Sequence, residues 1–390
     1  MHVGIDASAW DNERGFGRFT RSLVEALAAR DSGFRYTLLF GRPPERPVPA
    51  GVATVIAGAQ RSMSEASSGS GARAGADMLT LSRAAARLKA DLFFFPASYS
   101  FFPILSRVPK LVCIHDTIPE RFPDLIFPTR RNFRLWQAKS WLARAQARRI
   151  LTVSEASAAD IATMLGVPRD RIDVTTEGAD ETFRAIADKT RLAAARARHG
   201  IAEGDRVLIY IGGFNRHKNV LRLIEAMPAI LAACPAARLV IVGRITGDRF
   251  WDNVDELKAG ASADARASDR IGFAGEISDA DMAELLNISD ALVFPSLWEG
   301  FGLPAVEAMQ CGTPVLASER SSLPEVVGDG GLLFDPERTE DLASAAIRLL
   351  TEPGVRDRLA ANALARSRRF TWEKSAELTE AAFRRTIGPT

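Results

Sequence analysis

Cysteine is scarce in this sequence of 390 residues, and long apolar runs are absent. The three cysteines, Cys113, Cys234 and Cys311, lie far apart and form no C-x-x-C pair, which argues against a disulfide framework and a structural zinc site. No run reaches the ~18 apolar residues of a membrane-spanning helix. Residues 1–6 have the pattern of a strand and not of a signal peptide. These absences predict a cytoplasmic protein, with peripheral contact at the inner face of the plasma membrane left open.

An excess of charge of either sign is lacking too. The 50 Lys and Arg residues against 48 Asp and Glu leave a net charge of +2, which gives no support to nucleic-acid binding. Hydrophobic residues make up 47% and charged residues 25%, as in ordinary globular proteins. A chain of this length exceeds one typical core, so two domains are expected.

Short apolar segments alternate with amphipathic helical segments along the chain. Nearly continuous apolar strands are typical of sheets that helices cover on both faces. The predicted strands are Val3–Ile5, Tyr36–Phe40, Val52–Ile56, Leu92–Phe95, Leu111–Ile114, Ile150–Val153, Ile172–Thr175, Val207–Ile211, Leu239–Val242, Ile271–Phe273, Ala291–Phe294 and Val315–Ala317. The predicted helices include Arg18–Ala29, Glu155–Leu165, Val220–Ala233, Leu303–Cys311 and Trp372–Thr386. This alternation predicts parallel sheets and an α/β class.

The alternation restarts near Arg206, after a stretch rich in Ala and Arg. We therefore expect two Rossmann-like domains, residues 1–188 and 189–370, and a C-terminal helix at 371–390 that returns to the first domain. Residues 64–77 are small and polar, which fits a mobile loop near the site as well as a surface insertion without a role.

The strongest motif is the segment PSLWEGFGLPAVEA at residues 295–308. Glu299 and Glu307 frame a Gly-x-Gly turn between a strand and a helix, which is where open parallel sheets bind ligands. An ordinary acidic helix start would account for Glu299 alone but not for the framed pair. Three backbone N–H groups at this helix start suit an anion or a sugar hydroxyl, those of Phe301, Gly302 and Leu303.

This segment resembles the E-x7-E signature of glycosyltransferase family 4, a retaining group with the GT-B fold. The resemblance implies that Glu299 contacts the transferred sugar or the phosphate region, and that Glu307 holds the ribose of the nucleoside. Residues 290–296 and 312–317 also match the family in order and spacing. The implied fold has two Rossmann-like domains whose sheets face each other across a cleft. The first would bind the acceptor and the second the nucleotide-sugar donor.

A second motif, GGFNRHKN at residues 212–219, again follows a strand. A departing nucleoside diphosphate needs a cation, and Arg216 and Lys218 are the candidates, with His217 as a rival. The family has Lys at the position of Lys218, but its usual Arg falls where this chain has Gly213. Arg216 as the substitute for that arginine is our inference from the residues.

Two weaker motifs follow strands of the first domain. Glycines after the first strand let the backbone approach a ligand, and they resemble the family's G-x-G-R-[FY] loop, which faces the donor phosphates. The residues concerned are Gly15, Gly17 and Arg18. His115 also follows a strand, although a lone histidine is more often structural. It resembles the family's active-site histidine, and the phrase HDTIPERFP from His115 resembles bacterial mannosyltransferases of O-antigen and exopolysaccharide assembly.

The sequence thus predicts a retaining transfer of a hexose, by resemblance mannose from GDP-mannose, to a glycan or a polyprenyl-linked acceptor. The alternatives are a UDP-sugar-dependent transferase, a sugar-nucleotide epimerase and a non-catalytic nucleotide-sugar-binding protein. No cofactor or required metal is expected, because no cluster of His, Cys, Asp and Glu has ligand spacing. Asp279 and Asp281 follow Ser278, which indicates helix capping and not a metal site.

Residues 127–149 contain seven basic residues and no acidic residue, and the basic residues are interleaved with Phe133, Trp136 and Trp141. This composition fits peripheral contact with anionic lipid or a lipid-linked acceptor, and it fits a solvated helix equally well.

Overall fold

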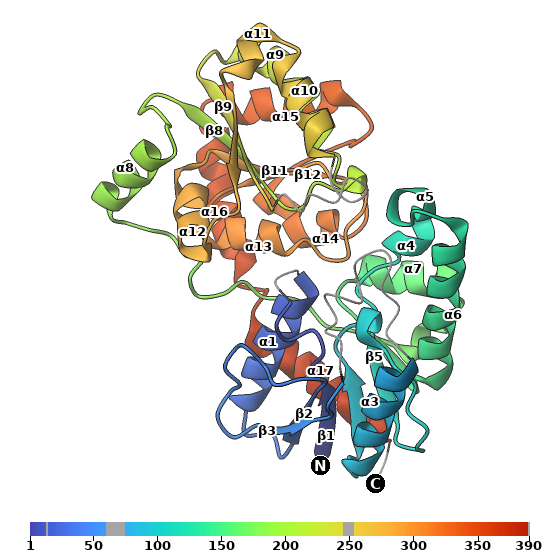
Figure 1. The fold of residues 1–390 in the computed structure, drawn as a ribbon. Coiled ribbons are helices and arrows are strands. Elements are labelled where there is room, and N and C mark those ends of the chain that lie inside the picture. The colour runs from blue at the N-terminus through green and yellow to red at the C-terminus, as the bar shows by residue number, and fades with distance from the viewer. Residues whose placement is uncertain (13–14, 60–74, 245–252, 389–390) are drawn as a thin grey trace. The chain divides into compact units, whose positions relative to one another are not determined.

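The computed structural model describes residues 1–12, 15–59, 75–244 and 253–388, and the chain divides into two compact units (Figure 1). Unit 1 comprises residues 1–177 and 371–390, and unit 2 comprises residues 178–370. Of the polar segment 64–77, residues 64–74 lie outside the described residues, and 75–77 begin a helix.

The first boundary falls after Glu177 and not at 188 as the sequence suggested. The reason lies in hydrogen bonds of the connecting segment to Asn287 of unit 2. The side chain of Asn287 accepts from the backbone N–H of Ile186 at 2.7 Å and donates to the carbonyl of Arg184 at 2.9 Å. These bonds attach the connection to unit 2, upstream of the predicted boundary.

Unit 1 is built on a seven-stranded parallel sheet in the order β3-β2-β1-β4-β5-β6-β7. Its strands are β1 (His2–Asp6), β2 (Arg35–Phe40), β3 (Ala53–Ile56), β4 (Leu92–Phe95), β5 (Lys110–Cys113), β6 (Arg149–Thr152) and β7 (Ile172–Val174). Its α-helices are α1 (Gly15–Ala28), α3 (Gly75–Arg87), α4 (Ile118–Arg121), α5 (Pro123–Ile126), α6 (Arg130–Gln146), α7 (Glu155–Leu165) and α17 (Trp372–Ile387), with 3-10 turns at Ser98–Ser100 and Arg169–Arg171.

Unit 2 is built on a six-stranded parallel sheet in the order β10-β9-β8-β11-β12-β13. Its strands are β8 (Arg206–Ile211), β9 (Ala237–Val242), β10 (Ile271–Gly275), β11 (Ala291–Phe294), β12 (Val315–Ser318) and β13 (Gly331–Phe334). Its α-helices are α8 (Lys189–Arg198), α9 (Val220–Ala233), α10 (Val254–Ser262), α11 (Ala265–Ser268), α12 (Asp279–Ile288), α13 (Leu303–Gln310), α14 (Leu323–Val327), α15 (Thr339–Thr351) and α16 (Val355–Ser367), with 3-10 turns η3 (Arg216–Lys218) and η4 (Gly328–Gly330).

Strand β4 shows why the apolar segments become central strands. Successive side chains of a strand point to opposite faces, so both faces of LFFF must be covered. Phe93 and Phe95 pack on one face in a core that includes residues of α3, α6 and α7. Phe94 instead meets Phe383 of α17, with ring centroids 5.3 Å apart. The C-terminal helix thus packs on the sheet of unit 1, against α1 as well (Figure 1).

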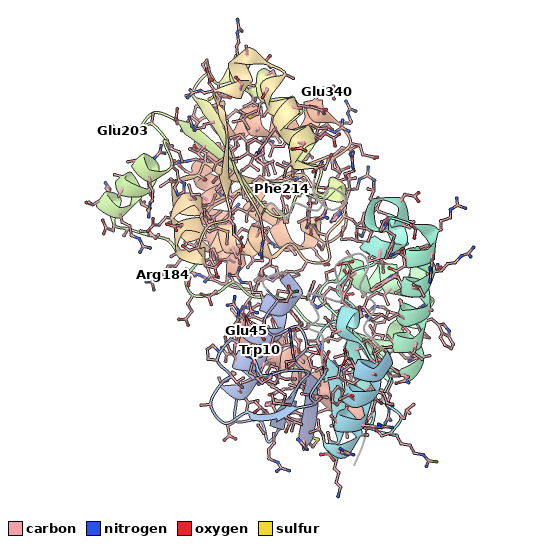
Figure 2. The ribbon with its side chains drawn as sticks, in the orientation of Figure 1. Trp10, Glu45, Arg184, Glu203, Phe214 and Glu340 are labelled. Atoms are coloured by element: carbon pink, nitrogen blue, oxygen red, sulfur yellow. The ribbon has the colours of Figure 1, made fainter. Side chains whose placement is uncertain are left out.

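Each unit has its own buried aromatic side chains, of which Trp10 of unit 1 and Phe214 of unit 2 are labelled in Figure 2. Trp10 is fully buried and meets Phe40 edge to face at 6.0 Å between centroids. Phe214 belongs to the main core cluster of unit 2 and lies in the turn after β8. The residues that follow this strand are therefore anchored to the core.

The predicted α/β class, the parallel sheets and the returning C-terminal helix are confirmed, as are all twelve predicted strands to within a few residues. The sequence missed β13, which lies at the edge of its sheet and is partly exposed. One helix start was wrong: α1 begins at Gly15 and not at Arg18, so the glycine motif lies in the helix and not in a loop before it.

Candidate active site

In unit 2 the predicted residues follow two neighbouring strands. Strand β8 leads to η3 with Arg216 and Lys218, and β11 leads to the turn with Glu299. Because both strands are parallel and paired, their carboxyl ends lie at the same edge of the sheet. A backbone bond joins the two turns directly, since the N–H of Leu297 donates to the carbonyl of His217 at 2.8 Å.

The structure brings Lys218 and Glu299 together as an ion pair. The Nζ atom of Lys218 lies 2.7 Å from Oε1 and 2.9 Å from Oε2 of Glu299. The side chain of Glu299 is 9% exposed and that of Lys218 is 21% exposed, so water screens this pair much less than a surface pair. Residues 81 positions apart in sequence thus form one charged site at the strand ends.

The turn that carries Glu299 is braced by the segment after β12. The backbone N–H of Glu299 donates to Oγ of Ser321 at 3.2 Å, and the hydroxyl of Ser322 donates to the carbonyl of Phe301 at 2.9 Å. Asn219 supports the neighbouring turn, because its amide group donates to the carbonyl of Pro295 at 3.1 Å. These bonds position the carboxylate before any ligand arrives.

Helix α13 begins directly after this turn, as the motif predicted. Gly302 precedes it with φ of +102°, and a Cβ atom there would lie 2.8 Å from the side chain of Leu323. Glycine is therefore required at this position both by backbone conformation and by space. The first N–H groups of α13 have no acceptor within the helix. Glu307 lies on α13 and is 2% exposed. The burial of Cys311 and, to a smaller extent, the nearby charge of Glu307 raise the pKa of the Cys311 thiol to about 12.

The structure does not bring Arg216 to the ion pair of Lys218 and Glu299. Its guanidinium lies 2.9 Å from Oε2 of Glu256 on α10, and its side chain is 61% exposed. His217 does not replace it, because burial and then the charge of Lys218 lower the pKa of His217 to about 3, so its ring is neutral near pH 7. Gly213 has room for a side chain with only the end of Asn215 nearby, so nothing in the backbone requires glycine there.

In unit 1, His115 follows β5 and is held from both sides. Its Nε2 atom lies 2.9 Å from the carbonyl oxygen of Pro96, which follows β4. Its Nδ1 atom lies 3.7 Å from Oε1 of Glu177, which follows β7. The hydroxyl of Ser157 donates to the carbonyl of His115 at 2.9 Å. Residues after neighbouring parallel strands therefore converge on the predicted active-site histidine.

The sequence analysis missed Glu177. A signal was present, because a carboxylate followed by glycine stands two positions after the end of the predicted strand Ile172–Thr175. Helix α17 fixes this segment, since the hydroxyl of Thr175 donates to the carbonyl of Ser375 at 3.0 Å.

The structure places the glycine motif of unit 1 inside a helix. Gly15 begins α1 and a Cβ atom there would meet nothing within 4 Å. A Cβ atom at Gly17 would lie only 2.0 Å from the carbonyl oxygen of Asn12. The backbone of Asn12 thus occupies the space beside Gly17 that a side chain would need. Arg18 is half-buried in the first turn of α1, and contact of these residues with donor phosphates stays a prediction.

Asp279 and Asp281 lie in the first turn of α12, and Oγ of Ser278 accepts from the N–H of Asp281 at 3.1 Å. The capping interpretation of this motif is confirmed. In the described part of the chain, no three His, Cys, Asp or Glu side chains gather as they would around a metal ion.

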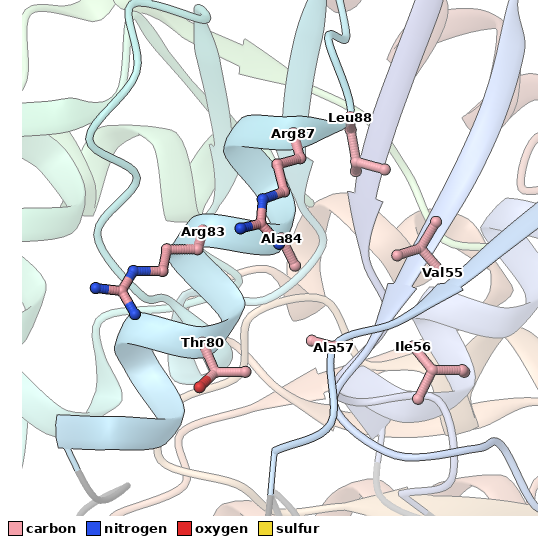
Figure 3. Close-up of a pocket in the computed structure, with 8 residues that line it drawn as sticks. All are labelled: Val55, Ile56, Ala57, Thr80, Arg83, Ala84, Arg87 and Leu88. Atoms are coloured by element: carbon pink, nitrogen blue, oxygen red, sulfur yellow. The ribbon is translucent and has the colours of Figure 1, made fainter.

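A cavity of about 450 Å³ lies between β3 and α3 of unit 1 and contains none of the predicted residues (Figure 3). The guanidinium of Arg83 points away from Val55 and Ile56 of β3 in this view. Among the helices that the structure describes, none combines the length and the apolar composition needed to cross a membrane.

Comparison with known families agrees with this geometry. Residues 14–183 match the family described as Glycosyltransferase Family 4, and residues 193–366 match the family described as Glycosyl transferases group 1. The chain belongs to glycosyltransferase family 4.

Curated relatives include O-antigen chain mannosyltransferase B of Escherichia coli, 32% identical over 238 residues, which is 61% of this chain and 61% of the relative. The serotype-specific mannosyltransferase WbdA of Escherichia coli is 28% identical over 284 residues, 71% of this chain and 34% of the relative. The D-inositol 3-phosphate glycosyltransferase of Rhodococcus jostii is 32% identical over 239 residues, 60% of this chain and 51% of the relative. The matched region thus spans between 34% and 61% of the lengths of these relatives.

Solved structures confirm the GT-B fold. Sucrose-phosphate synthase from Thermosynechococcus elongatus superposes with a TM-score of 0.75 at 21% identity and covers 99% of this chain and 98% of that one. HepE of Anabaena in complex with UDP and glucose superposes with a TM-score of 0.73 at 22% identity and covers 98% of both chains. WaaG, a glycosyltransferase of lipopolysaccharide biosynthesis, gives a TM-score of 0.72 at 18% identity with 98% coverage of both.

Proposed function

We propose that this protein is a retaining glycosyltransferase that transfers mannose from GDP-mannose to a glycan or polyprenyl-linked acceptor in cell-surface polysaccharide synthesis. Unit 2 binds the donor and unit 1 binds the acceptor. The observation that carries the proposal is the braced ion pair of Lys218 and Glu299 at the carboxyl ends of β8 and β11. Family membership supports the transfer reaction, and two mannosyltransferases among the relatives support the donor sugar.

The reaction develops negative charge on the departing diphosphate. A fixed ammonium group can stabilise that charge without reorganising, which is the usual source of a large rate effect. In this proposal Lys218 provides the group, Glu299 orients it and contacts the sugar, and Glu307 accepts hydrogen bonds from the ribose. The side chains thereby take the role that a metal ion has in other transferases, and the proposed reaction has no required metal.

Donor binding tests the proposal directly. Thermal unfolding of the purified chain is followed with GDP-mannose, GDP, UDP-glucose and UDP in turn. A ligand at about one hundred times its Kd stabilises the folded state by about 2.7 kcal/mol. We expect GDP-mannose and GDP to raise the Tm, and UDP compounds to leave it unchanged.

Incubation of the stabilising donor with and without a polyprenyl-linked glycan acceptor then separates the alternatives. Release of GDP that depends on the acceptor, with a product that keeps the anomeric configuration of the donor by NMR, supports retaining transfer. Conversion of the nucleotide sugar without an acceptor indicates an epimerase. Stabilisation by UDP sugars alone contradicts the GDP-mannose assignment, and no response to any nucleotide contradicts the whole proposal.

We further propose that helix α6 gives the protein peripheral contact with anionic lipid. Its outer face combines exposed apolar and basic side chains, since Leu135 is 58% exposed and Trp141 is 63% exposed, with Arg131 and Arg134 exposed beside them. Helical spacing places these four residues on one face, and α6 has no acidic residue. Apolar burial and attraction to anionic headgroups would act together at this face.

Sedimentation with vesicles tests this contact. We expect binding to vesicles with 30% phosphatidylserine, and at least a tenfold weaker binding for the variant Arg131→Ala/Arg134→Ala, because each basic residue contributes about 1 kcal/mol near an anionic surface. Replacement of Arg358, an exposed arginine on α16 of unit 2, is the matched control. Equal binding to purely zwitterionic vesicles, or unchanged binding of the double variant, would contradict the assignment.

A further inference from the structure

Glu177 is a buried carboxylate whose position is determined by its own unit. Glu177 is 8% exposed. Its Oε1 atom lies within ion-pair distance of the ring of His115. The preceding residues are bonded to α17 through Thr175 and Ser375. The next residue, Gly178, already belongs to unit 2. Glu177 is thus the last residue of unit 1 before the chain crosses to unit 2, and it faces the predicted active-site histidine.

The contacts of the His115 ring determine where its protons lie. A carbonyl oxygen can only accept, so the bond to Pro96 at 2.9 Å requires a proton on Nε2. The Nδ1 atom then faces the carboxylate of Glu177 at 3.7 Å, which is an ion-pair distance. A lone pair on Nδ1 would be repelled by this carboxylate, and a second proton there would be attracted to it. The arrangement therefore favours the imidazolium form.

We propose that Glu177 is a positioning residue for His115: it orients the imidazole ring and keeps both ring nitrogens protonated. The role of His115 beside the transferred sugar rests on the proposed function, whereas the effect of Glu177 on the ring does not. A carboxylate that fixes the protonation and the orientation of a histidine is a recurrent device in enzyme sites.

The surroundings of the ring agree with this role. Burial by itself lowers the pKa of His115, but the facing groups of Cys113 and Glu177 raise it by more, so its pKa lies well above the usual value. Helix α1 contributes Phe19 to the ring, edge to face at 4.6 Å between centroids, whereas the hydroxyl of Ser157 on α7 donates to the backbone carbonyl of His115. The net effect of these neighbours thus favours the protonated ring.

Replacement of the carboxylate by its uncharged isostere removes the charge and keeps the packing. In Glu177→Gln the amide N–H can donate to an unprotonated Nδ1, while Pro96 still holds the proton on Nε2. We therefore expect the pKa of His115 to fall in this variant, because the neutral form of the ring gains a donor at Nδ1 and the charged form loses its carboxylate partner. Glu177→Asp retains the charge and serves as the conservative variant, and Glu155→Gln removes an exposed carboxylate of α7 as the matched control.

The test is an NMR titration of the imidazole rings, in which the chain's four histidines are distinguished by a His115→Gln variant. We expect the titration midpoint of His115 to lie well above 6.5 in the wild type and in Glu177→Asp, and to be clearly lower in Glu177→Gln. Glu155→Gln should leave it unchanged. An unchanged midpoint in Glu177→Gln would overturn the proposal whatever reaction the protein catalyses.

Turnover provides the second readout. In Glu177→Gln we expect kcat to fall about tenfold for each pH unit above the lowered pKa, because the imidazolium fraction falls in that proportion. The Kd for GDP, measured by calorimetry, should stay within about twofold, since His115 faces the sugar and not the nucleotide in the proposed function. Equal losses in kcat and GDP affinity would indicate a structural role and overturn the assignment. If no donor is turned over at all, the proposed function fails while the NMR result still decides the role of Glu177.

Discussion

Replacement of Lys218 by alanine is expected to lower turnover by about 10²- to 10³-fold, the loss typical of removing one preorganised group that stabilises developing charge. The ammonium group of Lys218 is held by both carboxylate oxygens of Glu299 at 2.7 and 2.9 Å, so it is in place before the diphosphate departs. Steady-state kinetics with GDP-mannose and the acceptor measure the loss.

Two variants separate the chemical effect of Lys218 from a structural one. Lys218→Ala leaves Glu299 nearly buried without its cation, which destabilises the fold, and the double variant Lys218→Ala/Glu299→Gln removes that charge as well. We expect the double variant to regain stability but not turnover. Arg216→Ala is the matched control in the same turn, because its partner Glu256 is exposed enough that the pair contributes less than about 1 kcal/mol.

The kinetic assay also decides whether side chains or a metal ion neutralise the departing diphosphate. Transfer by the wild type should continue in excess chelator. If chelator abolishes transfer and magnesium or manganese restores it, Lys218 is not the group that neutralises the diphosphate. Turnover of Lys218→Ala within tenfold of the wild type would likewise contradict its role.

Replacement of Glu307 by alanine should weaken the binding of GDP and of GDP-mannose by the same factor, roughly 10- to 150-fold. That range corresponds to about 1.5–3 kcal/mol for hydrogen bonds to a charged acceptor. Glu307 is 2% exposed on α13, the helix that begins after the Gly302 turn, so its carboxylate is positioned by a regular element and not by a loop. Calorimetric titration with GDP measures the effect.

Glu307→Gln controls for packing, because it keeps the shape of the side chain and one acceptor oxygen. We expect an intermediate affinity for this variant and an unfolding temperature close to that of the wild type. Guanine, a base without ribose, should bind all three proteins equally. If Glu307→Ala binds GDP normally, Glu307 does not hold the ribose.

Much of the site could be predicted because it follows the order of elements. A motif that comes after a parallel strand lies at the carboxyl edge of the sheet whatever the rest of the chain does, and Lys218 and Glu299 were found in this way. Gly302 could be predicted for the same reason, since its backbone conformation is local to the turn.

The partners of these residues could not be predicted. Arg216 and Lys218 stand two positions apart in one basic turn, and the sequence does not distinguish them. In the folded protein Lys218 meets Glu299 from the neighbouring strand, whereas Arg216 is engaged by Glu256 from α10. His217 shows the same limit, because its neutral ring results from burial that only the packed unit creates.

The sequence by itself determined the α/β class, twelve of the strands and the positions at which ligand-binding residues leave the sheets. These features depend on hydrophobic pattern and on glycine and proline at turns, which act within a few residues. Tertiary structure alone decided the boundary after Glu177, the pairing of Glu177 with His115 and the choice of Lys218 over Arg216 as the partner of Glu299. Ion pairs and burial join residues that are far apart in sequence, so they are defined only when the strands have been placed side by side.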